Sequence, residues 1–221
     1  MKPNYRLTAL AATLSLSAVA NAAVITSFTN LDFDSGAVTT PGPFVGFDAP
    51  AANEIIGWSN TPGTLVDSGV EAVGAWWGPY QVNSAFLRSG DGAYNLSAYT
   101  IGLGDVFDIS MFAKGWNSGP TGAQLTVTLF YGSDPTTNAI GSFSTGALTQ
   151  GGSGGWTQYT SGSIAATGGS IGQTLGIKVV SDGPAGSFGN FDEIQVNVIP
   201  EPSAALLGGL GMFALLRRRR A

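Results

Sequence analysis

Alternation of apolar and polar residues with a period of two runs through the middle of this chain and limits the folds it can adopt. Within residues 105–114, four apolar side chains share one face: Phe107, Ile109, Met111 and Ala113. Successive side chains of a β-strand point to opposite faces, so this spacing predicts a strand with one buried side. No stretch between Ala23 and Val198 keeps a helical apolar period for three turns. The pattern therefore predicts an all-β fold.

Other segments repeat this pattern and are separated by turn-forming residues. Further strands are predicted at residues 93–101, 125–131, 156–164, 174–179 and 193–198. Glycine, proline, serine and aspartate gather between them, as they do in β-turns. Regularly spaced strands with such turns predict an antiparallel β-sandwich. The glycine-rich segment 151–155 is interpreted as a hairpin loop inside one domain, and residues 34–85 as short strands joined by long loops.

Charge and composition exclude several functions. The 221-residue chain contains no cysteine and no histidine, which excludes a Ser-His-Asp triad, cysteine nucleophiles and the usual zinc sites. Between Ala23 and Val198 the only basic residues are Arg88, Lys114 and Lys178, and thirteen acids give a balance of 3 − 13 = −10. A body this acidic repels phosphate backbones, so we expect no nucleic-acid partner.

The N-terminal residues are typical of a secretion signal. Lys2 and Arg6 form a positive segment, residues 7–19 an apolar segment, and Ala20-Asn21-Ala22 a cleavage triplet. We expect a signal helix that is removed by cleavage after Ala22.

The last residues form a third kind of segment. The tripeptide Pro200-Glu201-Pro202 precedes an apolar run, Ala204–Leu216, and the chain then continues with Arg217, Arg218, Arg219 and Arg220. As a helix, the thirteen residues of the run span about 20 Å, and flanking residues or snorkelling arginines extend this toward the roughly 30 Å hydrocarbon core. Because Lys- and Arg-rich ends stay cytoplasmic, we expect a short transmembrane helix with the body of the protein on the far side of the membrane.

This order of motif, apolar helix and basic end resembles the PEP-CTERM sorting signal of exported bacterial proteins, and Gly208, Gly209 and Gly211 match the small residues of its helix. The resemblance implies processing by an exosortase-type membrane enzyme and transfer to the cell surface or extracellular matrix. A plain C-terminal membrane anchor is the alternative. The predicted domains are a signal peptide at 1–22, a β-sandwich at 23–198 and a sorting signal at 199–221.

The body resembles jelly-roll carbohydrate-binding modules with a galactose-binding-like fold. Residues 30–34 match the Asn-x-x-Phe-acid motif with which such modules often open, and residues 191–196 match the aspartate that leads into their final strand. Residues 94–96, 104–105 and 113–116 are also similar. The resemblance implies a jelly-roll-like sandwich that binds a sugar.

Aromatic residues beside turn formers are the candidates for that binding: Trp76, Trp77, Tyr80 and Trp116. Flat aromatic faces stack on sugar rings, while nearby polar groups fix orientation. The alternative is that these rings cap the hydrophobic core, as expected of a purely structural matrix protein. Trp58 and Trp156 are predicted to belong to the core.

We predict no catalytic residue. A glycosidase needs two carboxylates about 5–10 Å apart across a cleft, and most acids placed beside Gly, Ser or Pro are turn formers. The expected function is a non-catalytic binding or structural module. The alternatives are a carbohydrate-binding module that acts on exopolysaccharide and a carboxylate-based glycosidase.

One carboxylate is singled out by strand parity. Asp192 has the parity of Ile194, Val196 and Val198, so its side chain is predicted to point to the apolar side. A buried carboxylate needs a partner, either a backbone N–H or a hard cation held by oxygens. The resembled modules often hold a structural calcium between the opening motif and the closing aspartate. That resemblance implies a calcium near Asp34 and Asp192, with Asp32 as a further ligand.

Overall fold

The computed structural model describes residues 22–35, 45–46, 55–61, 68–72, 83–117, 119–151 and 155–199. They belong to one compact unit, Ala22–Pro200. The described residues form strands, turns and loops without a helix, as the all-β prediction requires. The predicted signal helix and C-terminal helix lie outside these ranges, and within them no helix is long and apolar enough to span a bilayer.

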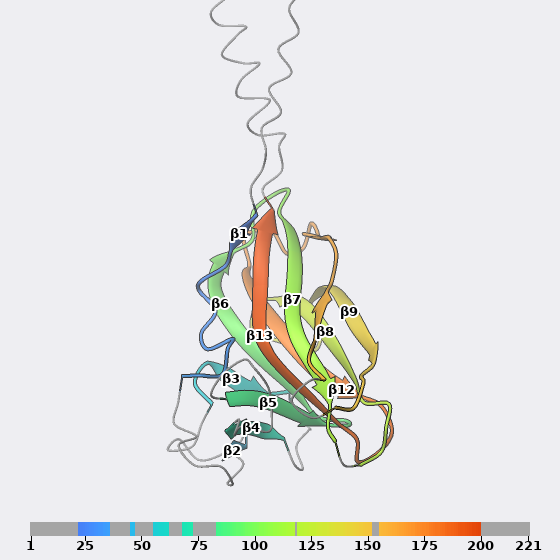
Figure 1. The fold of residues 1–221 in the computed structure, drawn as a ribbon. Helices are drawn as coiled ribbons and strands as arrows, with labels where there is room; N and C mark the ends of the chain where they lie inside the picture. The colour runs from blue at the N-terminus through green and yellow to red at the C-terminus, as the bar shows by residue number, and fades with distance from the viewer. Residues whose placement is uncertain are drawn as a thin grey trace, which may run out of the picture. The chain divides into compact units, whose positions relative to one another are not determined.

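Thirteen strands occur within the described residues (Figure 1). Their bounds are β1 (Ala23–Val24), β2 (Val45–Gly46), β3 (Trp58–Asn60), β4 (Gly69–Ala72), β5 (Asn83–Arg88), β6 (Gly92–Thr100), β7 (Val106–Gly115), β8 (Gln124–Tyr131), β9 (Ala139–Ala147), β10 (Thr157–Thr160), β11 (Ile164–Ala165), β12 (Thr174–Asp182) and β13 (Phe188–Ile199).

These strands form two antiparallel sheets. Sheet A has the order β10-β7-β13-β5-β4-β2, with β1 added to β13 and β11 added to β7. Sheet B has the order β3-β6-β12-β8-β9. In Figure 1, β13 and β7 run side by side in front, and β12, β8 and β9 lie behind them.

The predicted apolar face of β7 is the centre of the core. Phe107, Ile109, Met111 and Ala113 are completely buried, and they share the core with Leu125, Val127 and Leu129 of β8 and with Leu175, Ile177 and Val179 of β12. Burial of one such side chain contributes about 1.5–3 kcal/mol. Because the chain has no cysteine, this packing rather than cross-linking holds the two sheets together.

One interpretation of the connections is wrong. The segment 151–155 is not a hairpin loop, because the strands that it joins are β9, at the edge of sheet B, and β10, at the edge of sheet A. Residues 34–85 contain the short strands expected of them, β2, β3 and β4, and β5 begins at Asn83 and pairs with β13.

Candidate functional site

Sheet A carries an unusual set of polar residues on the face that points away from the core, which we call the outer face of sheet A. Phe191 of β13 pairs with Ala113 of β7, and both point into the core. Their strand neighbours therefore point the other way: Asn190 pairs with Lys114, and Asp192 pairs with Phe112. In the same sheet Glu71 of β4 pairs with Ser84 of β5.

The centre of this outer face is buried although it lies outside the apolar core. Lys114 and Ser84 have 0% of their surface exposed, and Asn190 has 1%. Asn190 Nδ2 donates a hydrogen bond of 2.6 Å to Glu71 Oε1. Lys114 Nζ lies 5.1 Å from the centroid of the Trp156 ring, within the range of a cation–π contact. Four strands and the residue that precedes β10 thus contribute to one site. We call it the polar centre, and it consists of Glu71, Ser84, Lys114, Asn190 and Trp156.

Burial perturbs both ionisable groups of this centre. It lowers the pKa of Lys114 to about 8, although the Glu71 charge acts in the opposite direction. Burial also raises the pKa of Glu71, against the hydrogen bond from Asn190 and the positive charge of Lys114. Perturbed ionisable groups of this kind gather at functional sites more often than elsewhere.

Two acceptors of the polar centre have no protein partner. Among the described residues, Ser84 Oγ and Asn190 Oδ1 are buried and make no hydrogen bond. An unsatisfied buried polar group costs about 1–3 kcal/mol, so native proteins leave few of them. Such groups are satisfied when a ligand hydroxyl or a water molecule occupies the space beside them.

Aromatic rings border the polar centre: Trp116 and Phe188 are half-buried, and Phe86 is buried. Trp116 and Phe188 make an edge-on contact with their ring centroids 5.0 Å apart, and Phe86 lies 6.3 Å from Phe188. The Trp116 amide donates to the Phe188 carbonyl (3.1 Å), which continues the β7–β13 pairing and places both rings on the outer face. The predicted sugar-binding candidate Trp116 therefore lies two residues after Lys114, opposite Phe188, which is two residues before Asn190.

The remaining aromatic predictions have different outcomes. Trp58 belongs to the core as predicted, with its indole N–H donating to the Asn30 carbonyl at 2.9 Å. Trp156 was also predicted to be core, and this is wrong: its ring is half-buried and lies against the Lys114 ammonium. Trp76, Trp77 and Tyr80 lie outside the described residues.

Sequence reasoning missed most of the polar centre. It did not identify Glu71, Ser84 or Asn190, which come from three strands that only the tertiary fold brings together. One signal was present: Lys114 is among three basic residues of the whole body, and it falls in a strongly alternating strand.

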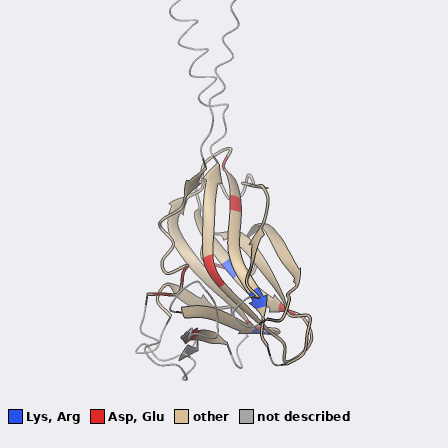
Figure 2. Cartoon of the chain, viewed as in Figure 1, with Lys and Arg blue, Asp and Glu red and all other residues tan. Residues whose placement is uncertain are grey.

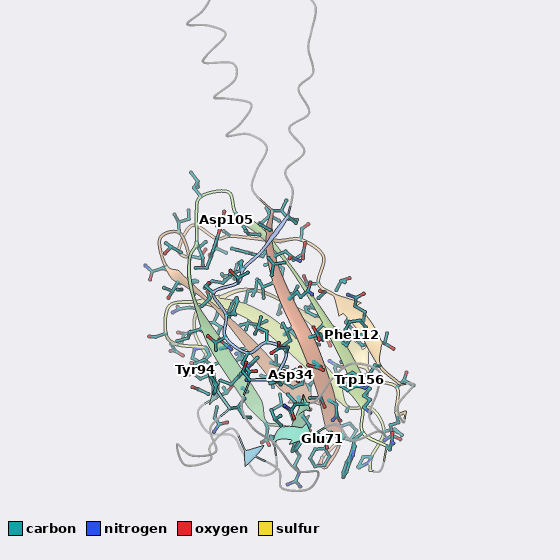
Figure 3. All side chains as sticks on the ribbon, turned by 60° about the vertical axis from the view of Figure 1, so that its left-hand side comes forward. Asp34, Glu71, Tyr94, Asp105, Phe112 and Trp156 are labelled. Atoms are coloured by element: carbon teal, nitrogen blue, oxygen red, sulfur yellow. The ribbon has the colours of Figure 1, made fainter. Side chains whose placement is uncertain are left out.

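A second polar region surrounds the predicted calcium ligands. The loop 30–35 is tied to both neighbouring strands of sheet A. Leu31 accepts a hydrogen bond from the Ile194 amide (3.1 Å), and Asp34 Oδ1 accepts one from the Asn83 amide (3.2 Å). Asp192 Oδ1 accepts a hydrogen bond of 2.8 Å from the Glu193 amide. The loop and Asp192 thus meet at β13 and β5, with Asp34 labelled in Figure 3.

Strand parity assigned Asp192 to the apolar side of the sheet, and this is wrong, although the side chain is buried as expected. A β-bulge interrupts the β7–β13 register between Asp192 and Gln195, and Glu193 adopts a φ of 50°. As a result Phe191 and Ile194 both point into the core although they are three residues apart. Asp192 therefore lies on the outer face of sheet A, where it is 2% exposed.

Burial raises the pKa of Asp192 to about 8 together with smaller contributions from the charges of Glu193, Asp34 and Asp32, against the hydrogen bond from the Glu193 amide. Its surroundings offer only oxygen ligands, which is the chemistry calcium prefers. In the part of the chain that the structure describes, however, no three His, Cys, Asp or Glu side chains are grouped so that they could hold a metal ion. Calcium binding therefore stays a prediction.

The fold and the tail together define the class: a β-sandwich protein that carries a C-terminal sorting signal. Residues 198–220 match the PEP-CTERM protein-sorting motif. The motif indicates export and membrane anchoring before processing. It begins inside β13, so the Pro-Glu-Pro tripeptide follows directly after Ile199, the last paired residue of sheet A. A comparison with curated proteins finds no significant match.

Solved structures resemble the chain in fold. A cyclase from Fischerella sp. TAU superposes with a TM-score of 0.58 at 16% identity, over 82% of this chain and 100% of the cyclase. The arabinose-bound α-L-arabinofuranosidase MgGH51 gives 0.51 at 18% identity, over 80% of this chain and 26% of the enzyme. These likenesses establish the antiparallel β-sandwich alone. The neighbours also include carbohydrate-binding modules, such as the CBM22-1 xylan-binding domain of Paenibacillus barcinonensis Xyn10C, with a TM-score of 0.42 at 18% identity over 74% of this chain and 99% of that domain.

Proposed function

We propose that this protein is a non-catalytic polysaccharide-binding module, which an exosortase-type enzyme transfers to the cell surface or extracellular matrix. The observation that carries the proposal is the outer face of sheet A. Unsatisfied buried acceptors there lie next to half-buried aromatic rings. The sorting motif supports the exported location.

Each part of this face has a role in binding a sugar. The rings of Trp116 and Trp156 offer apolar faces or edges against which a pyranose ring packs. Ser84 Oγ and Asn190 Oδ1 accept hydrogen bonds from hydroxyl groups, while Lys114 donates. A ligand without those hydroxyl groups leaves the buried acceptors unpaired, and this gives the site its selectivity for polyols.

Affinity electrophoresis tests the proposal. The purified full chain is run in native gels that contain xylan, β-1,4-galactan or alginate, and retardation is compared with a gel without polysaccharide. We expect retardation by at least one of the three. Trp116→Ala combined with Trp156→Ala should lower the affinity by about tenfold or more, because stacked rings contribute on the order of 1.4 kcal/mol each.

The matched control is Tyr94→Ala, which removes a half-buried ring from sheet B, 6.1 Å from Phe130. This variant should keep full retardation. The predicted role of Trp76 and Trp77 is tested in the same gels with Trp76→Ala combined with Trp77→Ala. If no polysaccharide retards the folded wild-type chain, the purely structural alternative replaces binding.

A carboxylate-based glycosidase is the second candidate. The observation that favours it is the presence of two carboxyl groups with raised pKa values, Glu71 and Asp192, on the outer face of sheet A. A carboxylic acid that stays protonated near neutral pH can act as a general acid. Release of reducing sugar from the same polysaccharides, lost in both Glu71→Gln and Asp192→Asn, would establish it over simple binding.

We also propose that a structural calcium joins the loop 30–35 to β13. Asp34 and Asp192 would hold the ion, with Asp32 as a further ligand. The support is electrostatic: Asp192 is buried beside three other acidic residues, and the raised pKa of its carboxyl group reflects the unfavourable charge that a cation would neutralise. A ligand that binds the native state alone raises the melting temperature with its concentration. An unchanged melting temperature in calcium and in chelator would exclude the ion.

A further inference from the structure

Exposed apolar side chains gather at one end of the domain. The described residues include five large hydrophobic side chains that are well exposed, and three of them lie at this end: Val24 (53%), Leu103 (86%) and Ile171 (39%). We call the end that carries Val24, Leu103, Ile171 and Ile199 the exit end, because β13 finishes there.

Strand register places these residues together. Ile199, the last residue of β13, pairs with Val106, the first residue of β7, and Val24 of β1 pairs with Asn197. The β6–β7 turn that carries Leu103 directly precedes Val106. The turn that carries Ile171 is bound to it, since the Gly172 amide donates to the Ile101 carbonyl (2.8 Å). Asp105, in the β6–β7 turn, and Glu71 lie at opposite ends of the domain in Figure 3.

The turn that presents Leu103 is held rigidly. Asp105 Oδ2 accepts hydrogen bonds from the Tyr99 hydroxyl (2.8 Å) and from the Gly102 amide (2.7 Å). The Asp105 carbonyl accepts a third bond from the Ala166 amide (2.8 Å), and Gly104 takes a φ of 82° that favours glycine. The turn therefore holds an aliphatic side chain in solvent at a fixed position, where a polar residue would be the usual choice.

The exit end also presents little free charge. Asp105 uses its carboxylate inside the turn, and Asp108 Oδ1 accepts a hydrogen bond from Asn197 Nδ2 (2.6 Å). The basic residues of the body lie elsewhere: Arg88 pairs with Phe188, Lys114 with Asn190 and Lys178 with Thr128. Figure 2 shows the blue segments away from the C-terminal end of β13. The two carboxylates at this end are thus hydrogen-bonded within the domain, and none of the three basic residues of the body lies there.

The sequence after β13 keeps this end close to a membrane. Four residues, 200–203, separate Ile199 from the apolar run that begins at Ala204. Even when fully extended, four residues span at most about 14 Å. While the apolar run is inserted, the exit end cannot move farther than this from the point where the run enters the bilayer.

We propose that Val24, Leu103 and Ile171 form a lipid-contact surface that rests in the interfacial region of the bilayer before the sorting tail is cut. The proposal depends on membrane anchoring by the tail and is independent of polysaccharide binding. Aliphatic side chains favour the boundary between headgroups and acyl chains, and a surface without basic residues suits zwitterionic phosphatidylcholine or phosphatidylethanolamine better than anionic lipid. Such contact holds the Pro-Glu-Pro tripeptide at the level of the membrane surface, where an integral membrane enzyme can cut it.

Site-specific fluorescence tests the contact in the full chain. Because the protein has no cysteine, Leu103→Cys can be labelled selectively with a polarity-sensitive nitrobenzoxadiazole probe. The labelled chain is reconstituted into phosphatidylcholine vesicles with or without lipid that carries a nitroxide near the headgroup. Ile56→Cys is the matched control, since Ile56 is 51% exposed and lies before β3, away from the exit end. Ile171→Cys provides a second reporter at the exit end.

We expect nitroxide lipid to lower the emission of probes at positions 103 and 171 about twofold or more, and to leave the probe at 56 nearly unchanged. Equal quenching at all three positions, or none at 103 and 171, would overturn the proposal. Protection of the probe at 103 that disappears when the protein-to-lipid ratio is reduced would assign the surface to a second copy of the chain and would overturn it as well. Retardation of the same labelled protein in polysaccharide gels reports separately on the proposed function.

Discussion

Replacing Lys114 with methionine tests whether the polar centre of sheet A contains a buried charge. Burial lowers the pKa of Lys114 to about 8, from 10.5 for an ordinary lysine. Between these values Lys114 holds its proton in the unfolded chain and loses it in the folded chain, so its contribution to the free energy of unfolding rises with pH. This contribution of Lys114 is complete above 10.5, the pKa of the lysine in the unfolded chain, and it is lost as the pH falls through about 8.

The size of this effect follows from the two pKa values. Between about pH 7 and about pH 9.5, proton linkage at Lys114 contributes at most about 2 kcal/mol of added stability, and partial relaxation around the ammonium reduces this to about 1–2 kcal/mol. Asp192, whose pKa is raised to about 8, lowers stability over the same range. Methionine has a similar shape to lysine and does not titrate, so the free energy of unfolding of the wild type relative to Lys114→Met isolates the lysine and should rise by about 1–2 kcal/mol over this range. The range stops below pH 10 because Tyr99, whose pKa burial and Asp105 raise to about 12, lowers stability as the pH rises above the ordinary value of 10.

Urea unfolding followed by tryptophan fluorescence measures both profiles. The matched control is Lys178→Met, which removes a half-buried lysine from β12 in sheet B and should keep the pH profile of the wild type. A difference between the wild-type and Lys114→Met free energies that stays constant or falls over this range would refute the reasoning, because another group would then carry the effect.

Three further predictions concern the calcium region, the brace of the β6–β7 turn and the sorting tail. Burial raises the pKa of Asp192 to about 8, so its contribution to stability is present below the ordinary value of 3.8 and is lost as the pH rises through about 8. In chelator at about pH 8, Asp192→Asn should therefore be more stable than the wild type by about 2 kcal/mol in urea unfolding, and calcium should raise the melting temperature of the wild type only. Gly104→Ala should lower the free energy of unfolding by about 1 kcal/mol because of its positive φ; an unchanged value would mean that the turn relaxes. Replacement of Pro200-Glu201-Pro202 by alanines should leave the precursor in the membrane fraction, whereas surface delivery at the wild-type size and rate would contradict sorting by this motif.

The strands that sequence alone predicts well are those with one buried face. β7 is the clearest case, because its alternation continues without interruption and its apolar face is fully buried. β5 was missed because residues on both of its faces are buried, so that Asn83, Ser84 and Phe86 give no alternating pattern. β9 was missed because glycine, serine and threonine fill an edge strand that contributes little to the core.

The candidate site could be predicted only in part, because it depends on pairing between distant strands. Trp116 was found through local composition, since it is an aromatic residue followed by turn formers. The Asn190–Glu71 hydrogen bond joins residues 119 positions apart, and no local pattern indicates that register. Asp192 shows the same limit: a single bulged residue, Glu193, reverses the face that a strict two-residue period assigns to it.

The position of β13 in sheet A determines when the protein can fold during export. β13 is the last strand of the described residues, yet it lies between β7 and β5 and also binds β1. Until it has crossed the membrane, the β7–β10 pair and the β5–β4–β2 group have no strand to join them. In a chain that crosses the membrane unfolded, the sandwich therefore cannot close before residues up to 199 have emerged. The sorting motif begins at residue 198, so the strand that completes sheet A and the start of the motif emerge together.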